Sequence, residues 1–285
     1  MISSIRIVGA GLIGTSIGLC LKAAGVNVEI ADIDSNTAKL AQDLVKSTPV
    51  SEPDLIIVAV PIGVNQSEVV KQLNANQSSI VCDLASVKSD LLLKVAELSA
   101  NAANFVSLHP MAGREMSGAQ SARADLFTGR AWIAIESDKS SKRAKEIAQE
   151  LIKMCGGSSY WMSSAEHDEV VAKISHVPQI LSTALAASLL NISEEKLNLS
   201  GQGLRDLTRL ADADSNLWSQ ILLENREKLT PVISDLLAQL EKIQQTLNDN
   251  NAEKMREFLA KGRDGKIKIP GKHGAKAREY SFLPI

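Results

Sequence analysis

The sequence is poor in cysteine, with Cys20, Cys82 and Cys155 as its only three. They are odd in number, widely spaced and without a C-x-x-C pair, so neither a disulfide framework nor a cysteine zinc site is indicated. No H-E-x-x-H spacing occurs either, and we expect no bound metal. The cysteine usage fits a reducing compartment, and we expect a cytoplasmic protein.

The sequence also lacks an excess of charge of either sign, since 31 Lys and Arg face 33 Asp and Glu, for a net charge of -2. Nucleic-acid-binding proteins carry clustered Lys and Arg that neutralise phosphates, so a nucleic-acid partner is not expected. The N-terminus has no basic region and cleavage site typical of a signal peptide. No stretch approaches the roughly 20 apolar residues of a membrane span, so no membrane association is expected.

Short β-branched apolar runs alternate with helical patterns over the first 160 residues or so. The runs are 5–8, 28–31, 55–60, 80–84, 105–108 and 132–135. Such alternation predicts a mainly parallel, doubly wound α/β sheet, and continuous rather than alternating apolar runs predict strands covered by helices on both faces. At roughly 150 residues per domain, a chain of 285 residues has room for about two domains.

The strand pattern stops after Met162, where Ser163 to Glu166 form a capping box that predicts the start of a helix. Apolar residues then recur at helical spacing, and beyond residue 264 Gly, Lys and Pro mix without a period. We therefore predict a Rossmann domain over residues 1–163, an all-α domain for substrate binding and dimerisation over 164–264, and an irregular tail over 265–285. The long apolar helices between 217 and 247 favour a homodimer through the all-α domain.

A G-x-G-x-x-G motif, made by Gly9, Gly11 and Gly14, lies between the first predicted strand and a predicted helix. The first glycine can make the turn, the second lets the backbone approach a pyrophosphate, and the third lets the helix pack close to the strand. Leu12 and Ile13 begin that helix, whose N-terminal N–H groups attract phosphate without help from Lys or Arg. The context predicts a dinucleotide site; a purely structural turn is the alternative.

Asp32 follows the second predicted strand, about 20 residues beyond the glycines, where a carboxylate can accept hydrogen bonds from the ribose hydroxyls of a dinucleotide. A phosphorylated ribose would meet a like charge there, and no Arg follows within the next turn, so we expect NAD rather than NADP. Val60 and Pro61 end the third predicted strand at the edge where ligands of open α/β sheets bind, and we expect them to shape the cofactor rim.

Four further segments resemble the prephenate and arogenate dehydrogenases. They are DLASVK at 83–88, HPMAG at 109–113, ISHVP at 174–178 and GLRDLTR at 203–209. The resemblance covers about residues 1–260 and implies an NAD-dependent enzyme of tyrosine biosynthesis that oxidatively decarboxylates prephenate to 4-hydroxyphenylpyruvate. Arogenate, which carries an amine in place of the keto oxygen of the side chain, remains the alternative substrate.

The resemblance assigns catalysis to two residues at predicted strand ends. His109 is the expected base for the substrate hydroxyl, because an ordinary imidazole titrates near pH 6.5 and so is available as a neutral acceptor. Ser86 would contact the substrate hydroxyl or the nicotinamide side, and its position before a helix also suggests an N-cap.

Substrate binding is assigned by the same resemblance to the second domain and to one loop. Arg209 would hold a substrate carboxylate bidentately, with Arg205 assisting from the same helix face. His176 and Glu115 would also contact the substrate. His167 precedes His176 by nine residues, half a turn out of phase on a continuous helix, and we expect a structural role for it.

One position limits the resemblance, a second extends it, and two other functions stay open. Gln179 stands where many family members have a second histidine, and Trp218 matches an aromatic position that could reach a site across a dimer interface or simply be core. A β-hydroxyacid-type dehydrogenase would share the architecture but use a catalytic lysine, for which Lys173 is the candidate. A non-catalytic NAD-binding module is the third hypothesis.

Overall fold

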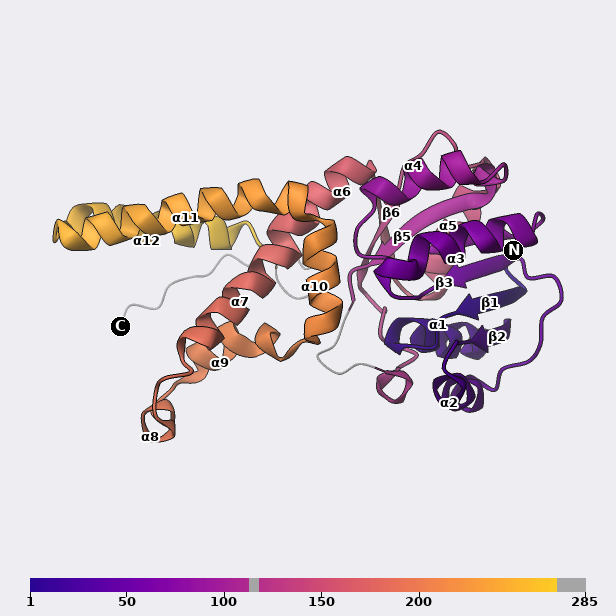
Figure 1. The fold of residues 1–285 in the computed structure, drawn as a ribbon, viewed down its shortest axis with the longest axis horizontal. Coiled ribbons are helices and arrows are strands. Elements are labelled where there is room, and N and C mark those ends of the chain that lie inside the picture. Colours follow the sequence, from indigo (N-terminus) through magenta and orange to yellow (C-terminus); the bar gives the residue numbers. More distant parts are fainter. Residues whose placement is uncertain (113–117, 271–285) are drawn as a thin grey trace. The chain divides into compact units, whose positions relative to one another are not determined.

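The computed structural model describes residues 1–112 and 118–270, and its described strands form one seven-stranded sheet of order β2-β1-β3-β4-β5-β6-β7 (Figure 1). The strands are β1 Ser4–Val8, β2 Asn27–Ala31, β3 Leu55–Val58, β4 Ile80–Asp83, β5 Phe105–Pro110, β6 Ala131–Ile135 and β7 Ser158–Met162. Neighbouring strands are parallel except for the antiparallel pair β5 and β6. The predicted mainly parallel, doubly wound sheet is confirmed.

Helices connect the strands and make up most of the chain after Met162. They are α1 Leu12–Ala23, α2 Ser35–Val45, α3 Ile62–Ala75, α4 Ser89–Leu98, α5 Lys142–Met154, α6 Ser164–Val171, α7 Val177–Ser188, α8 Glu194–Leu197, α9 Gln202–Thr208, α10 Ser215–Glu224, α11 Arg226–Asn248 and α12 Ala252–Ile267. A π-helical turn, Ala172–His176, joins α6 to α7, and a 3-10 turn, Arg209–Asp212, follows α9. The predicted all-α character is confirmed for residues 164–264, and residues 271–285 of the predicted irregular tail lie outside the described residues.

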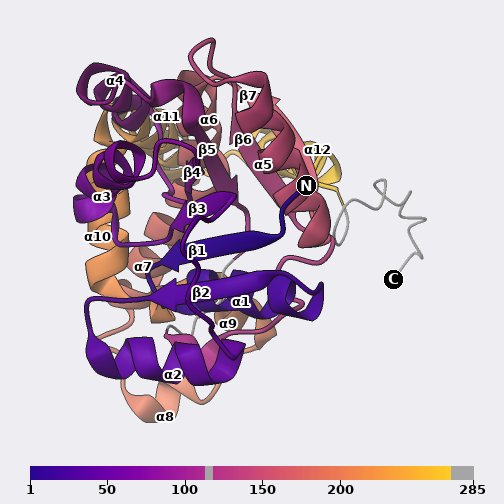
Figure 2. The same ribbon diagram turned by 90° about the vertical axis from the view of Figure 1, so that its right-hand side faces the viewer.

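The sheet is covered on both faces, which explains why its strands are continuously apolar. Helices α1, α2 and α5 pack on one face and α3 and α4 on the other (Figure 2). In β3 and β4 all the residues are buried, because alternate side chains enter the two different cores. Ile57 joins the core with α1, whereas Ile56 joins the core with α3 and α4.

Two elements differ from the sequence-based expectation. Strand β7 was not predicted separately, because its residues are serines and aromatics rather than a β-branched run, and it forms the sheet edge beside β6 with a largely exposed start. At the other end of the chain, α12 continues to Ile267, past the predicted helical limit at residue 264. Gly262 and Gly265 lower helix propensity without ending the helix, since α12 itself contains no proline and the next one is Pro270.

Contact density divides the chain into two units, Met1–Leu229 and Thr230–Ile285. The first unit holds the sheet together with α6 to α10, and α6 packs against β6 and α4. These units are defined by contacts alone. The predicted boundary near residue 163, between a cofactor-binding and a substrate-binding domain, stays a prediction. Within the first unit the helical run Ser164–Ser188 is long and apolar enough to cross a membrane, by length and composition alone. This differs from the expectation that no stretch of the sequence approaches a membrane span. The run also carries several buried polar side chains.

The glycine turn between β1 and α1 is shaped by two close backbone approaches and one open position. Gly9 has φ +107°, and a Cβ there would overlap the carbonyl of Ala59. A Cβ on Gly14 would overlap the carbonyl of Gly9, so α1 can pack against the turn only with glycine at that position. At Gly11, by contrast, nothing in the described protein lies within 4 Å of an added Cβ.

We expect Gly14→Ala to lower the free energy of unfolding by about 1–3 kcal/mol, because α1 must shift away from the turn. The matched control Gly11→Ala, with open space and an ordinary φ of -73°, should cost less than about 1 kcal/mol. Urea unfolding of both variants checks this. An equal loss at the two positions would show that the helix does not depend on close packing at Gly14.

Candidate active site

A chain of hydrogen bonds joins the end of β5 to the first turns of α6. His109 is the penultimate residue of β5, and its Nδ1 atom lies 2.9 Å from Nε2 of His167. Nδ1 of His167 lies 2.7 Å from Oδ1 of Asp168. The two imidazoles meet edge to face, with ring centroids 5.1 Å apart. His167 and Asp168 are buried and His109 is half-buried, so one edge of the His109 ring can meet a ligand.

The structure corrects the expectation that His167 faces away from the region of His176, because its ring is hydrogen bonded to His109. On a continuous α-helix His167 and His176 would point in opposite directions, but residues 172–176 are π-helical. The i→i+5 turn accommodates an extra residue and rotates everything after it, so both histidines serve the same region. Such π-bulges occur frequently at functional sites, and nothing in the apolar pattern of this segment signals one.

Asp168 also connects to His176 through its main chain. Nδ2 of Asn225, which follows α10, donates to the carbonyl of Asp168 at 2.9 Å and lies 3.1 Å from Nδ1 of His176. The ring of Trp218 stands edge-on to His176, with centroids 6.1 Å apart and an interplanar angle of 86°. Trp218 is therefore a half-buried neighbour of the site within the same chain. No sequence motif pointed to Asn225.

Lys88 is fully buried and ties the β4 loop to the chain of histidines. Its Nζ atom donates to Oδ2 of Asp83 at 2.8 Å and to the carbonyl of Leu108 at 2.7 Å, next to His109. Its main-chain N–H donates to Oδ1 of Asp168 at 3.0 Å. Oδ1 of Asp83 accepts from Ser107 Oγ at 2.5 Å, so the buried carboxylate and ammonium are both hydrogen bonded, as buried charges require.

Lys88 belongs to the motif at 83–88 but was assigned no role from the sequence, although a lysine five residues beyond a strand-ending aspartate was the available signal. The same loop corrects the expectation for Ser86. Helix α4 begins at Ser89 with Lys88 as its N-cap residue, so Ser86 is not the N-cap. Ser86 stays half-buried in the turn between β4 and α4, at the carboxyl edge of the sheet.

Burial keeps the three histidines of the site uncharged. Desolvation lowers the pKa of His109 well below its usual value, and the charge of Lys88 and the neighbouring His167 act in the same direction. Burial also lowers the pKa of His167, against the opposing hydrogen bond to Asp168. For His176 burial lowers the pKa to about 4. At neutral pH all three imidazoles are therefore neutral, and each has one donor and one acceptor nitrogen.

The predicted cofactor residues come together at the same edge of the sheet. The N–H of Ala10 donates to Oδ2 of Asp32 at 2.7 Å, which fixes the glycine turn against the end of β2. Leu12 and Ile13 open α1, and Gly11 is its N-cap residue, without a side chain to occupy the first-turn N–H groups. The open space beside Gly11 and the anchored carboxylate of Asp32 fit a dinucleotide, with the pyrophosphate on the turn and a ribose on the acid.

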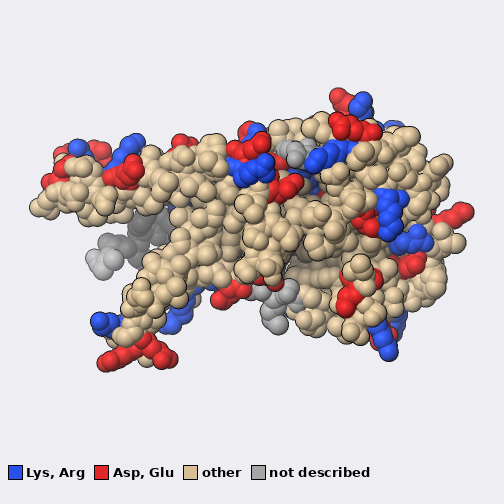
Figure 3. Space-filling view, viewed as in Figure 1, with Lys and Arg blue, Asp and Glu red and all other residues tan. Residues whose placement is uncertain are grey.

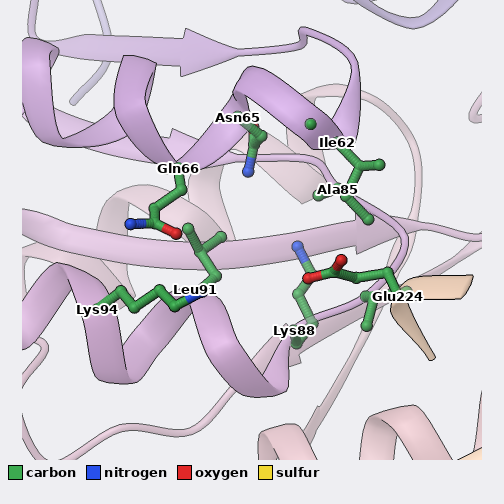
Figure 4. Close-up of a pocket in the computed structure, with 10 residues that line it drawn as sticks. Ile62, Asn65, Gln66, Ala85, Lys88, Leu91, Lys94 and Glu224 are labelled. Atoms are coloured by element: carbon green, nitrogen blue, oxygen red, sulfur yellow. The ribbon is translucent and has the colours of Figure 1, made fainter. Parts of the chain in front are cut away.

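Val60 and Pro61 follow β3 directly, and Pro61 is the N-cap residue of α3. A cavity of about 210 Å³ lies beside them, between the start of α3, the β4–α4 turn and the end of α10 (Figure 4). Asn65, Lys88 and Glu224 are among its lining residues. The predicted cofactor rim therefore lies next to a hollow that reaches the buried lysine.

The helical side of the site is ordered around α7. Nε2 of Gln179 donates to the carbonyl of Leu210 at 2.8 Å, which fixes the 3-10 turn that begins with Arg209 beside α7. Arg209 and Arg205 are both exposed, and Arg205 donates to the carbonyl of Ser200 at 2.9 Å within its own segment. Glu115 lies outside the described residues. Among the described residues no group of three or more His, Cys, Asp and Glu side chains could hold a metal.

A glycine turn and ribose-binding acid at the edge of a parallel sheet, with a neutral half-buried histidine at the end of β5, define a nicotinamide-dependent dehydrogenase with a helical second part. Comparison with known proteins specifies it further. Residues 17–161 match the family model described as the prephenate dehydrogenase nucleotide-binding domain, and residues 163–261 match the prephenate dehydrogenase dimerization domain. The chain belongs to the prephenate dehydrogenase family, and the resemblance inferred from the motifs is confirmed.

Individual relatives agree with this assignment. A prephenate dehydrogenase of Lactococcus lactis is 31% identical over 276 residues, which cover 91% of this chain and 75% of the relative. The crystal structure of the Aquifex aeolicus prephenate dehydrogenase in complex with hydroxyphenyl propionate and NAD+ has a TM-score of 0.85 at 25% identity, covering 94% of this chain and 99% of that one. An arogenate dehydrogenase of Synechocystis shares the fold, with a TM-score of 0.76 at 22% identity and coverage of 92% and 98%.

Because folding lowers the pKa values of His109, His167 and His176, the unfolded chain binds more protons than the folded one below about pH 6.5. The free energy of unfolding should therefore be fully retained above that pH and fall as the pH drops toward 5, by up to about 1.4 kcal/mol per pH unit for each histidine. Urea unfolding at several pH values measures this. His176→Asn should flatten the dependence, and a stability independent of pH in this window would contradict the buried neutral histidines.

Proposed function

We propose that this chain catalyses the NAD-dependent oxidative decarboxylation of prephenate to 4-hydroxyphenylpyruvate, in tyrosine biosynthesis. Its membership of the prephenate dehydrogenase family supports the substrate. The observation that carries the chemistry is the half-buried His109, held neutral at the sheet edge where the glycine turn and Asp32 also lie. A neutral imidazole in that place is a general base.

The chemistry divides between cofactor and protein. NAD, when bound, supplies the hydride acceptor. His109 would take the proton of the substrate hydroxyl, so that the carbon bearing it can become a carbonyl carbon as hydride departs. Carbon dioxide then leaves and the ring becomes aromatic, which makes the sequence irreversible. Ser86, at the β4–α4 turn, is proposed to orient the hydroxyl or the nicotinamide.

Binding of the two substrate carboxylates is proposed for the helical side. Arg209 offers a planar guanidinium on the turn that Gln179 fixes beside α7, and Arg205 would assist from α9. His176 would donate a hydrogen bond, and the family resemblance assigns a substrate contact to Glu115. For the cofactor, the carboxylate of Asp32 favours the free ribose of NAD over the phosphorylated ribose of NADP.

With prephenate and NAD+, the protein should form NADH, and His109→Asn should lower kcat by about 10²–10⁴-fold, because the base is lost. Absorbance of NADH measures both. The control is Lys173→Ala, which should leave kcat unchanged, since Lys173 is exposed on the π-helical turn. Full activity of His109→Asn together with an inactive Lys173→Ala would replace this proposal with a β-hydroxyacid-type mechanism, and tight NAD binding without turnover would indicate a non-catalytic module.

The same assay distinguishes the two substrates of the family. We expect a higher kcat/KM with prephenate than with arogenate, because the relatives from Lactococcus lactis and Bacillus subtilis, at 31% and 27% identity, are named prephenate dehydrogenases. A higher kcat/KM with arogenate would assign the alternative.

We also propose that the chain is a homodimer through its helical part. Large apolar side chains are exposed after Met162, among them Leu190 and Leu199 in turns and Leu223 on α10, and few charged residues lie over α7 and α10 (Figure 3). Exposed apolar area of this kind typically marks an interface, and residues 163–261 match a family dimerization domain. Sedimentation equilibrium should give twice the chain mass; a monomer at micromolar concentration would contradict the proposal.

A further inference from the structure

We infer that Asp168 fixes opposite tautomers on two imidazoles of the site, leaving His109 with a bare Nε2 and His176 with a protonated one. The first tautomer is imposed by the carboxylate through His167, the second by the main-chain carbonyl through Asn225. His167, Asp168 and Asn225 are thus positioning residues. The roles of the two Nε2 atoms rest on the proposed function, whereas the tautomers themselves follow from the hydrogen bonds alone.

The first branch begins at a group that can only accept. Oδ1 of Asp168 lies 2.7 Å from Nδ1 of His167, so this nitrogen must carry the proton. A neutral imidazole has one N–H, and Nε2 of His167 is therefore an acceptor. Its partner at 2.9 Å, Nδ1 of His109, must then be the donor. His109 is left with a lone pair on Nε2, on the edge that remains for the substrate hydroxyl.

The second branch begins at a group that can only donate. The amide orientation of Asn225 is fixed because its Nδ2 donates to the carbonyl of Asp168 at 2.9 Å. The same NH₂ group lies 3.1 Å from Nδ1 of His176, so this nitrogen accepts and the proton is on Nε2. His176 therefore offers an N–H, which suits a carboxylate or keto oxygen of the substrate.

The arrangement holds only if Asp168 stays in place as an acceptor, and the β4 loop ensures this. The main-chain N–H of Lys88 donates to the same Oδ1 atom at 3.0 Å, so an oxygen is required there by two donors. The Nζ atom of Lys88 meanwhile holds the carbonyl of Leu108, the residue before His109. The buried Lys88 thus fixes both ends of the first branch, at Asp168 and beside His109. When His109 takes up a proton, its positive charge lies two hydrogen bonds from the carboxylate of Asp168.

Removing the acceptor tests the first branch. Asp168→Leu, similar in shape, should lower kcat by about 10²–10⁴-fold, as loss of a correctly protonated base does, while KM for prephenate and Kd for NAD stay within about threefold. Asp168→Asn is the matched control: its amide oxygen can still satisfy the Lys88 and His167 donors, so most of the tautomer and at least tenfold more kcat than in Asp168→Leu should remain. Equal kcat values in a folded Asp168→Leu and the wild type would overturn the inference.

Exchanging a donor for an acceptor tests the second branch independently. Asn225→Asp presents only oxygen to Nδ1 of His176, so the proton should move to that nitrogen and the Nε2 donor be lost. KM for prephenate should rise about ten- to a hundredfold, with kcat changed by less than about threefold. Loss of packing alone would not give a kcat effect at one residue and a KM effect at the other, and an unchanged KM would overturn this branch.

The proposed function can fail separately. Absence of NADH formation by the wild type, or full activity of His109→Asn, refutes that function and leaves the tautomers in place. If the wild type is active and His109→Asn is not, the variants at Asp168 and Asn225 decide the present inference alone. Thermal unfolding and NAD binding establish that each variant is folded. If Asp168→Leu is not, the KM of Asn225→Asp still supports or overturns the second branch, and the imidazole ¹⁵N shifts of the wild type support or overturn the first.

Discussion

The buried carboxylate of Asp168, on the first helix after the sheet, is the constraint on which the rest of the site depends. Asp168 is 1% exposed, and an ionised carboxylate removed from water is stable only when donors surround it. The Lys88 N–H and the ring of His167 are two of those donors. Satisfying Asp168 therefore determines where protons lie on the imidazoles that it reaches, and burial of the same region keeps those imidazoles neutral.

The fold brings these groups together because parallel strands end at a common edge. The glycine turn follows β1, Asp32 follows β2, and His109 lies near the end of β5, so cofactor and base arrive at the same side of the sheet. Helix α6 begins directly after β7, with Ser163 Oγ accepting from the N–H of Glu166 at 3.2 Å. That cap fixes the first turn, and His167 and Asp168 follow it within reach of β5.

Individual residues show which features of the fold and the site could be predicted from the sequence. The glycine motif, Asp32 and the Ser163 cap were predictable, because each depends on local conformation and neighbours a few residues away. The strands of the sheet were predictable except for β7, whose serines and aromatics lack the β-branched pattern. His109 was recognised through the family motif, and its position at the end of β5 agrees with that assignment.

The connections between distant segments were not predictable. His167 was assigned to structure because the helix was taken as regular, and a π-helical turn invalidates counting at 3.6 residues per turn. Lys88 and Asn225 act through partners 80 and 57 positions away. Such contacts arise from packing of α6 against β6 and α4 and of α10 against α3, which no local pattern encodes.

The most direct test of this account is the ¹⁵N chemical shift of the imidazole nitrogens in the wild-type protein near neutral pH. The account predicts three neutral rings, with the proton on Nδ1 in His109 and His167 and on Nε2 in His176. A protonated Nε2 on His109, or a His176 ring with its proton on Nδ1, would contradict it.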